Sequence, residues 1–236
     1  MSTRTAREAD WPSIENTLFG PDAFFELAEE EILGEKMKIF KTRRRSLREY
    51  VAASADFGDT EYIIHGDRRI TYKEHADLVA STARFLADRF DIRHGDRVAI
   101  YSENRPEWII AYWAIVSLGA VATALNGWWT DDEVAFGLEI TEPKVLLADG
   151  KRLARISNLD LSCPVFDFEK DSDEMLSHAV GADLPNTPIA EDDPSTILFT
   201  SGTTGRPKCA LASHRAVIGF VQSAMAGGAR AMMLEG

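Results

Sequence analysis

The chain has 236 residues, of which 45% are hydrophobic and 27% charged, the composition of an ordinary soluble globular protein with one large domain or two small ones. Its 26 basic and 38 acidic residues give a formal net charge of −12, which argues against nucleic acid as a partner because phosphates would repel such a chain. The two cysteines, Cys163 and Cys209, offer neither a disulfide framework nor paired metal ligands, so we expect a reducing cytoplasm.

Residues 1–45 are expected to form an N-terminal leader, and their polar start lacks the apolar core of a signal peptide. Within this leader the pattern predicts a helix over residues 24–33 that stops at Gly34. A group of basic residues follows. A solvated surface is the simpler interpretation of such a group, and peripheral contact with a membrane or an anionic cofactor is the alternative. The group consists of Lys36, Lys38, Lys41, Arg43, Arg44, Arg45 and Arg48.

The rest of the chain, residues 46–236, is expected to form part of one larger domain in which short apolar strands alternate with helices. Three capping boxes predict helix starts, at Ser46 with Glu49, Thr71 with Glu74 and Thr130 with Glu133. The expected strands are 61–64, 69–71, 97–101, 121–125, 145–148, 164–166, 197–200 and 209–212. The first two form a hairpin, residues 181–194 form a surface connection, and Ser213 caps a last helix.

One segment, Trp108–Trp129, contains no charged residue and is long enough to cross a bilayer. Its apolar residues fall at helical spacing before Gly119, and a short apolar run follows that glycine. We therefore predict a helix, a glycine cap and a buried strand, with no transmembrane span. The alternation of strand, helix and strand predicts an α/β fold, a mainly parallel sheet with helices on both faces.

The most informative segment runs from Thr200 to Lys208 and joins two glycines, four hydroxyl side chains and a lysine in nine residues. Glycines allow backbone N–H groups to turn toward an anion, and hydroxyl groups and a lysine add further donors. A Thr-rich turn between strands is the plain alternative. A Walker loop is not supported, because Pro207 precedes Lys208 and Cys209 follows it, where that pattern needs Gly and then Ser or Thr.

This run resembles the phosphate-binding signature of the adenylate-forming enzymes, a superfamily that includes acyl-CoA synthetases, the adenylation domains of peptide synthetases and the luciferases. The resemblance extends over about residues 46–225. Further blocks occur upstream in the order that the family has: Ile70–Tyr72, Gly95–Ile100, Asn104–Trp108, Leu118–Val121 and Leu125–Asn126. The family fold agrees with the sheet expected above, as the N-terminal part of such an enzyme's large domain.

The resemblance implies the ligands. Family members attack the α-phosphorus of ATP with a carboxylate oxygen, release pyrophosphate, and pass the acyl group to a thiol, often that of coenzyme A. The residues implied to surround the β- and γ-phosphates are Thr200, Ser201, Gly202, Thr203, Thr204, Gly205 and Lys208. Mg²⁺ is the implied metal, but the block that supplies its glutamate does not occur here, nor does the small C-terminal domain with its adenylation lysine. We therefore name no catalytic residue or metal ligand, and expect this chain alone not to complete adenylation.

A fatty acid is the expected acid substrate, and the enzyme class expected is a fatty-acid-CoA ligase. Acyl-AMP ligases and aryl-acid ligases of the same family remain open, as do a non-catalytic nucleotide-binding module and a nucleotide hydrolase with a variant loop.

Individual residues near the loop carry their own expectations. Cys209 stands where the family commonly has Gly, which would strain a left-handed backbone but not an extended one. His214 is expected to bond locally at a helix start, with a direct catalytic role as the alternative. Asn126 is expected to shape a turn beside the active site. The tryptophans expected to lie in the core or line a pocket are Trp113, Trp128 and Trp129.

Overall fold

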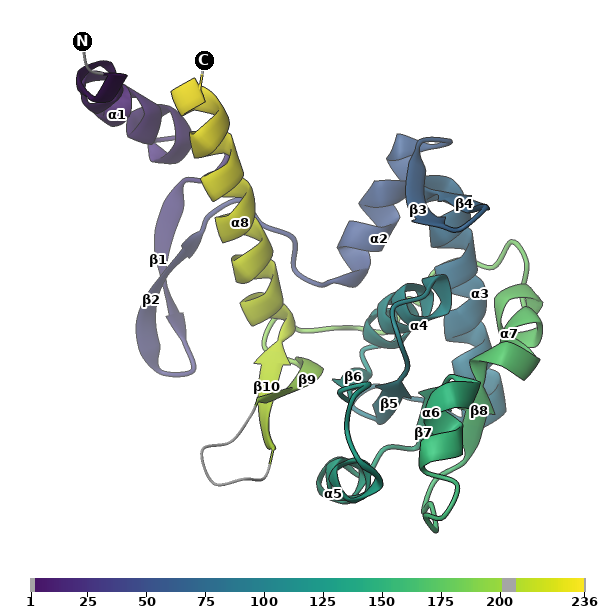
Figure 1. The fold of residues 1–236 in the computed structure, drawn as a ribbon. Coiled ribbons are helices and arrows are strands. Elements are labelled where there is room, and N and C mark those ends of the chain that lie inside the picture. Colours follow the sequence, from purple (N-terminus) through teal and green to yellow (C-terminus); the bar gives the residue numbers. More distant parts are fainter. Residues whose placement is uncertain (1–2, 201–206, 236) are drawn as a thin grey trace. The chain divides into compact units, whose positions relative to one another are not determined.

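The computed structural model describes residues 3–200 and 207–235 and divides the chain into two compact units. Residues 1–44 and 215–236 belong to the first unit, and residues 45–214 form the second, larger one. Figure 1 shows the course of the chain. The expected boundary at residue 45 between a leader and a larger domain stays a prediction.

The first unit contains α1 (Thr3–Phe19), the antiparallel hairpin of β1 (Leu27–Ile32) and β2 (Glu35–Phe40), and α8 (His214–Glu235) except its first residue. One cluster of its buried side chains comes from all four elements or the turns beside them and consists of Ile14, Leu18, Phe25, Phe40 and Ala226. The predicted helix over residues 24–33 is therefore wrong. Leu33 and Gly34 both have positive φ, 52° and 86°, which makes the two-residue turn that a hairpin needs. Cross-strand pairing outweighs the helical preference of the glutamates in β1.

The second unit is built on a six-stranded sheet with the order β10-β9-β6-β5-β7-β8. Every neighbouring pair in it is parallel except β9 with β10, which is antiparallel. The strands are β5 (Arg97–Tyr101), β6 (Val121–Ala124), β7 (Val145–Ala148), β8 (Val165–Asp167), β9 (Pro194–Thr200) and β10 (Lys208–Ser213). A separate hairpin joins β3 (Glu61–His65) and β4 (Arg68–Thr71). The predicted strands and hairpin are confirmed.

Helices cover both faces of this sheet, as the sequence predicts. On one face Ala99 and Tyr101 of β5 pack with residues of α5 (Asp131–Thr141) and with Ile156, which follows α6 (Gly150–Arg155). On the other face the register aligns Ile100, Leu147 and Phe166, and Phe166 contacts Phe85 of α3 (Tyr72–Phe90). Helices α4 (Pro106–Ser117) and α7 (Phe168–Ser177) contact α3.

Local signals set the helix boundaries, with one exception. The capping boxes of Thr71 with Glu74 and of Thr130 with Glu133 are both formed, at α3 and α5. The third is wrong: α2 (Arg48–Ser54) begins after Leu47, and Glu49 instead accepts a hydrogen bond from the Ser46 hydroxyl. A short 3₁₀ helix, Ala55–Phe57, follows α2.

The apolar segment from Trp108 folds as predicted into α4, a left-handed Gly119 with φ 74°, and β6. In the described part of the chain, α8 is the one helix with the length and mean hydropathy, 1.2, that a membrane span would need. Core helices of soluble proteins also meet these two criteria.

Candidate active site at the carboxyl edge of the sheet

The predicted phosphate loop connects β9 to β10. Thr200 is the last residue of β9 and pairs with Lys208, the first residue of β10, and the Thr200 hydroxyl donates to the Lys208 carbonyl oxygen at 3.4 Å. The predicted site residues Ser201, Gly202, Thr203, Thr204 and Gly205 lie outside the described residues, so their contacts stay predictions. Because β9 is parallel to β6, the loop leaves the sheet at its carboxyl edge, where open α/β sheets bind ligands.

The strand that enters the loop is anchored by an aromatic contact. Phe199 meets Trp129 edge-on, with ring centroids 4.7 Å apart, and both belong to the core cluster on this face. Gly137 of α5 makes the packing possible, because a Cβ built there would lie 2.9 Å from the Trp129 ring and 3.2 Å from Leu125. The position of Thr200 thus depends on close packing among α5, the β6 loop and β9.

A buried ion pair joins the loops that follow β5 and β7. Asp149, only 1% exposed, caps α6 and accepts hydrogen bonds from the backbone N–H of Arg152 and of Glu103, each at 2.8 Å. The Arg152 guanidinium lies 3.1 Å from the Asp149 carboxylate and 2.8 Å from that of Glu103. Burial opposes the charge on Asp149, but these donors outweigh it and lower the pKa of Asp149.

Side chains of α6 and β5 hold the loop that follows β6. Arg155 donates to the Gly127 carbonyl oxygen at 2.9 Å, and the Tyr101 hydroxyl donates to that of Trp129 at 3.1 Å. Asn126 shapes this turn as predicted, since its side-chain oxygen accepts the Trp128 N–H at 3.0 Å. Three loops of the carboxyl edge are therefore fixed by side chains that sequence reasoning missed. The one available signal was Asp149–Gly150 after an apolar strand, which is typical of a helix N-cap.

The structure confirms the expectation of a core or pocket position for some of the tryptophans and contradicts it for one. Trp129 is buried in the core, as expected, and Trp113 is half-buried against Tyr112. Trp128 contradicts the expectation, since it is 80% exposed.

Another buried carboxylate stabilises the start of α4. Glu107 accepts hydrogen bonds from Arg68 at 2.6 Å and Arg105 at 2.8 Å. Burial raises its pKa, but these two guanidinium groups more than compensate, and the pKa of Glu107 is lowered. These two ion pairs give the segment Asn104–Trp108 a structural role.

His214 makes contacts far along the chain, not local ones. Its ring Nδ1 accepts the backbone N–H of Leu47 at 3.1 Å, and its own backbone N–H donates to the Asp193 carbonyl oxygen at 3.0 Å. The ring is fully buried, its Nε2 has no partner among the described residues, and burial lowers its pKa to about 4. The geometry assigns His214 a structural position at the base of α8.

Cys209 lies in β10 opposite Phe199, and its φ is not positive. The extended alternative therefore holds, and a Cβ at this position causes no backbone strain. No group of three or more metal-binding side chains occurs among the described residues. The Mg²⁺ expectation stays a prediction.

Comparison with known proteins decides the family. The model of the family described as AMP-binding enzyme matches residues 50–233. The chain belongs to this adenylate-forming family. Two solved structures with TM-scores of 0.63 and 0.65 share this fold, which confirms the fold class.

The relatives are ligases of several acids. A 3-[(3aS,4S,7aS)-7a-methyl-1,5-dioxo-octahydro-1H-inden-4-yl]propanoyl:CoA ligase of Rhodococcus jostii (strain RHA1) is 30% identical over 72% of this chain and 38% of its own length. A 2-succinylbenzoate–CoA ligase of Bacillus velezensis is 33% identical over 62% of this chain and 29% of its own length. The chain thus spans about a third of the curated relatives that it matches.

Two solved structures resemble about three quarters of this chain. The N-terminal subdomain of Klebsiella oxytoca NpsA, in complex with 3-hydroxybenzoyl-AMSN, has a TM-score of 0.63 and 26% identity over 75% of this chain and 43% of that one. The inhibitor-bound N-terminal domain of Mycobacterium tuberculosis FACL13 has a TM-score of 0.65 over 72% of this chain and 45% of that one. Its 24% identity supports the fold alone. Both solved structures are of N-terminal parts of their proteins, and the sequence predicts that this chain is such a part.

Proposed function

We propose that this chain is the phosphate-binding N-terminal part of an ATP-dependent acyl-CoA ligase. In this reaction a carboxylate oxygen attacks the α-phosphorus of ATP, the bond to the leaving pyrophosphate breaks, and an acyl-adenylate forms. The thiolate sulfur of coenzyme A then attacks the acyl carbonyl carbon and displaces AMP. The observation that carries the proposal is the β9–β10 connection at the carboxyl edge of a parallel sheet, in a chain of the AMP-binding family.

The chain's own residues would act by positioning. Thr200 and Lys208 hold the two ends of the loop together, and Lys208 is exposed and forms no ion pair with another described residue. Its ammonium group would offset the charge that develops on the leaving pyrophosphate. The Asp149–Arg152 pair would keep the loops after β5, β6 and β7 in place around the nucleotide.

For the acid we propose a fatty acid. Support comes from the relatives named as CoA ligases for carboxylic acids with apolar bodies. An aryl acid is the second candidate, favoured by the NpsA subdomain, which was solved with a hydroxybenzoyl adenylate analogue. We further propose that the protein is cytoplasmic and that this chain alone does not catalyse the complete adenylation reaction.

Binding of the purified 236-residue chain to ATP, to pyrophosphate and to stable acyl-adenylate analogues would test the proposal. We expect ATP and pyrophosphate to bind, Lys208→Met to weaken both about tenfold or more, and Lys73→Met, on an exposed position of α3, to leave both unchanged. Failure of both to bind would contradict the phosphate-loop assignment.

Analogues that carry acetyl, palmitoyl and benzoyl groups would distinguish the acid classes without turnover. Tighter binding of the palmitoyl analogue supports a fatty acid, and tighter binding of the benzoyl analogue supports an aryl acid. ATP–pyrophosphate exchange with the same acids should show no activity. Exchange that depends on one acid would refute the proposed inactivity and identify the substrate.

A further inference from the structure

A cavity of about 520 Å³ lies at the edge of the sheet opposite the phosphate loop. Lys144 directly precedes β7, and Pro164 directly precedes β8, so their side of the sheet is its amino edge. Thr200 ends β9, which runs in the same direction, at the carboxyl edge. The cavity is therefore separate from the nucleotide site proposed above, and it does not depend on that function.

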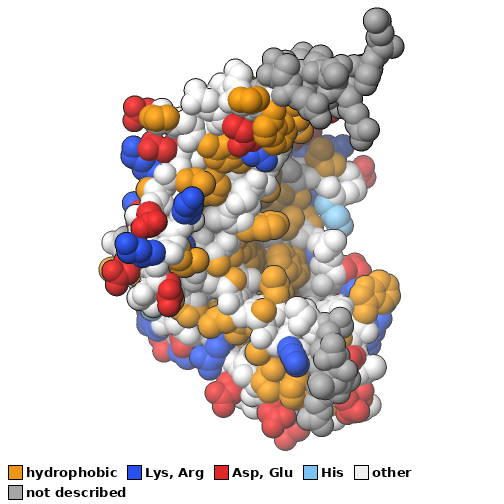
Figure 2. Space-filling view, turned by 90° about the vertical axis from the view of Figure 1, so that its left-hand side faces the viewer, with side chains coloured by type: hydrophobic (Ala, Val, Ile, Leu, Met, Phe, Trp, Pro, Cys, Tyr) orange, Lys and Arg blue, Asp and Glu red, His pale blue; other side chains and the backbone are white. Residues whose placement is uncertain are grey.

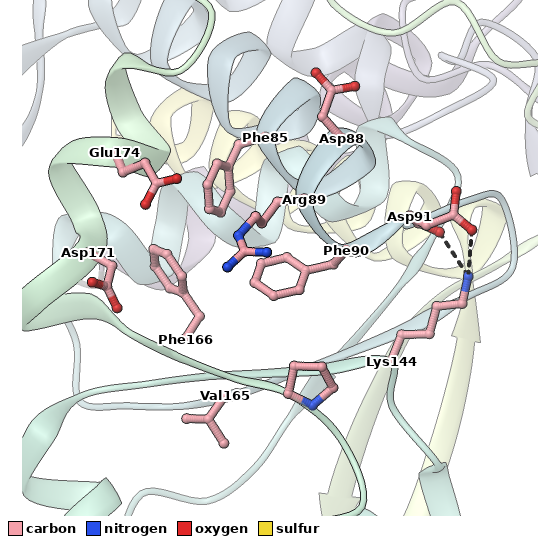
Figure 3. Close-up of a pocket in the computed structure, with 11 residues that line it drawn as sticks. Phe85, Asp88, Arg89, Phe90, Asp91, Lys144, Val165, Phe166, Asp171 and Glu174 are labelled. Carbon is pink, nitrogen blue, oxygen red and sulfur yellow. Dashed lines mark hydrogen bonds and ion pairs between the residues drawn. The ribbon is translucent and has the colours of Figure 1, made fainter.

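Aromatic rings form the inner wall of this cavity. The Phe85 ring centroid is 5.3 Å from that of Phe166 and 5.8 Å from that of Phe90, and all three rings meet edge-on. Val165 and Pro164 extend the apolar surface. Figure 3 shows these side chains around one opening. Phe85 and Phe166 are only 1% and 4% exposed, so Phe90, Pro164 and Val165 supply the apolar surface on which a small molecule would pack.

Charged side chains stand around the apolar wall, and some of them already have partners. Asp88 is paired with Arg84 and with His178. Lys144 is paired with Asp91 at 3.7 Å and with Asp96 at 2.9 Å. These four ion pairs account for every lining charge on the α3–β7 side except that of Arg89.

Three lining charges remain. Arg89, Asp171 and Glu174 form no ion pair with any other residue in the described ranges 3–200 and 207–235. The Arg89 guanidinium lies over the Phe90 ring, with its central carbon 5.8 Å from the ring centroid. Figure 3 shows Asp171 and Glu174, both from α7, across the opening from Phe90. A cationic group and two carboxylates thus face one apolar wall from different sides.

We propose that this cavity binds a small zwitterion with an apolar body, of the kind represented by an aromatic or branched-chain amino acid. The ligand's carboxylate pairs with Arg89, its ammonium group pairs with Asp171 and Glu174, and its side chain packs on Phe90 and Val165. A simple amine would leave Arg89 without a counter-charge, and a simple carboxylate would leave the two acidic residues without one. A zwitterion satisfies both, which is why this class fits the lining.

The test is a titration of the full chain with L-phenylalanine, phenethylamine and 3-phenylpropanoate, followed by the NMR signals of the Val165 methyl groups. We expect the Val165 signals to shift with all three compounds and phenylalanine to bind roughly fivefold more tightly than either analogue, because each analogue loses one partly exposed ion pair. Absence of any Val165 shift up to the solubility limit of phenylalanine would overturn the proposal. Equal affinity for the three compounds would overturn it as well.

Charge-neutral variants assign each contact. Arg89→Gln should weaken phenylalanine and 3-phenylpropanoate but not phenethylamine. Asp171→Asn with Glu174→Gln should weaken phenylalanine and phenethylamine but not 3-phenylpropanoate. Matched controls are Lys73→Gln on α3 and Asp173→Asn on α7, both exposed and outside the lining. Amino acids and acids could also enter the nucleotide site of an AMP-binding enzyme. Phenylalanine binding that Arg89→Gln leaves unchanged would place the ligand elsewhere and refute the assignment.

Discussion

The buried pair of Asp149 and Arg152 gives the sharpest prediction about stability. Asp149→Ala removes the carboxylate and leaves the guanidinium, whose side chain is 5% exposed, with Glu103 as its one remaining ionic partner. Breaking a buried pair on one side costs about 3–5 kcal/mol. The lost cap of α6 adds about 1 kcal/mol. Glu103 offsets at most about 1 kcal/mol, because its side chain is 58% exposed and exposed pairs contribute little.

The expected loss is therefore about 4 kcal/mol in the free energy of unfolding. It can be measured by urea unfolding followed by tryptophan fluorescence in a Trp11→Phe background, in which the four remaining tryptophans belong to the second unit. Asp167→Ala is the matched control. Asp167 also caps a helix, accepting the Glu169 N–H at 2.9 Å, but its ionic partner Lys170 is 78% exposed. That variant should lose only about 1 kcal/mol.

The pH dependence follows from the lowered pKa of Asp149. A carboxyl group whose folded-state pKa lies below its unfolded value stabilises the fold above the unfolded value, near 3.9 for an aspartate, and this stabilisation is lost as the pH falls through the folded-state pKa. The difference between wild type and Asp149→Ala should therefore be full at pH 7 and shrink below about pH 4. Equal losses for the Asp149 and Asp167 variants, or a difference unchanged at acid pH, would refute the reasoning.

Three further predictions concern single side chains. Gly137→Ala should destabilise the second unit by about 1–3 kcal/mol, because the added methyl group overpacks the core. Gly219→Ala has open space around the new Cβ and should stabilise α8 by up to about 1 kcal/mol, and equal effects of the two variants in thermal unfolding would contradict this. Burial lowers the pKa of His75 to about 4, so the folded state favours the neutral imidazole and the wild type loses stability as the pH falls from about 6.5 to 4. This loss should be smaller in His75→Phe, and parallel pH–Tm curves for the two proteins would argue against it. Cys209 is exposed, whereas burial raises the pKa of the Cys163 thiol, so a disulfide reagent should modify Cys209 first in mass spectra; faster labelling of Cys163 would refute this.

Much of the second unit could be predicted because its signals are local. The side-chain caps at Thr71 and Thr130 form within one helical turn, and four-residue apolar runs such as Val145–Ala148 leave little choice but buried parallel strands. The strand β1 could not be predicted, because Leu27–Ile32 contains three consecutive glutamates that favour a helix when read alone. Its conformation depends on pairing with β2 and on a positive φ at Leu33, which is rare for leucine.

One part of the candidate site could likewise be predicted from local sequence, and another part could not. The composition of the Thr200–Lys208 run indicates phosphate chemistry wherever the run lies in the fold, so this prediction needs no structure, and the contacts of the loop stay a prediction. The side chains that hold the surrounding loops could not, since Arg155 reaches Gly127 and Asp149 reaches Glu103 only after the parallel sheet has aligned the strand ends. Buried ion pairs of this kind carry no sequence pattern of their own beyond an N-cap aspartate.

Strand direction gives a physical reason for the different chemistry of the two proposed sites on one sheet. Parallel strands place all their carboxyl ends at one edge, where backbone N–H groups of the following loops and helix starts face outward and favour phosphate. At the other edge the ends of preceding helices meet the strand starts, and side chains must provide the charges, as Arg89, Asp171 and Glu174 do here. A ligand at the amino edge must therefore carry its own complementary charges, and this requirement separates the proposed zwitterion from the nucleotide proposed for the loop.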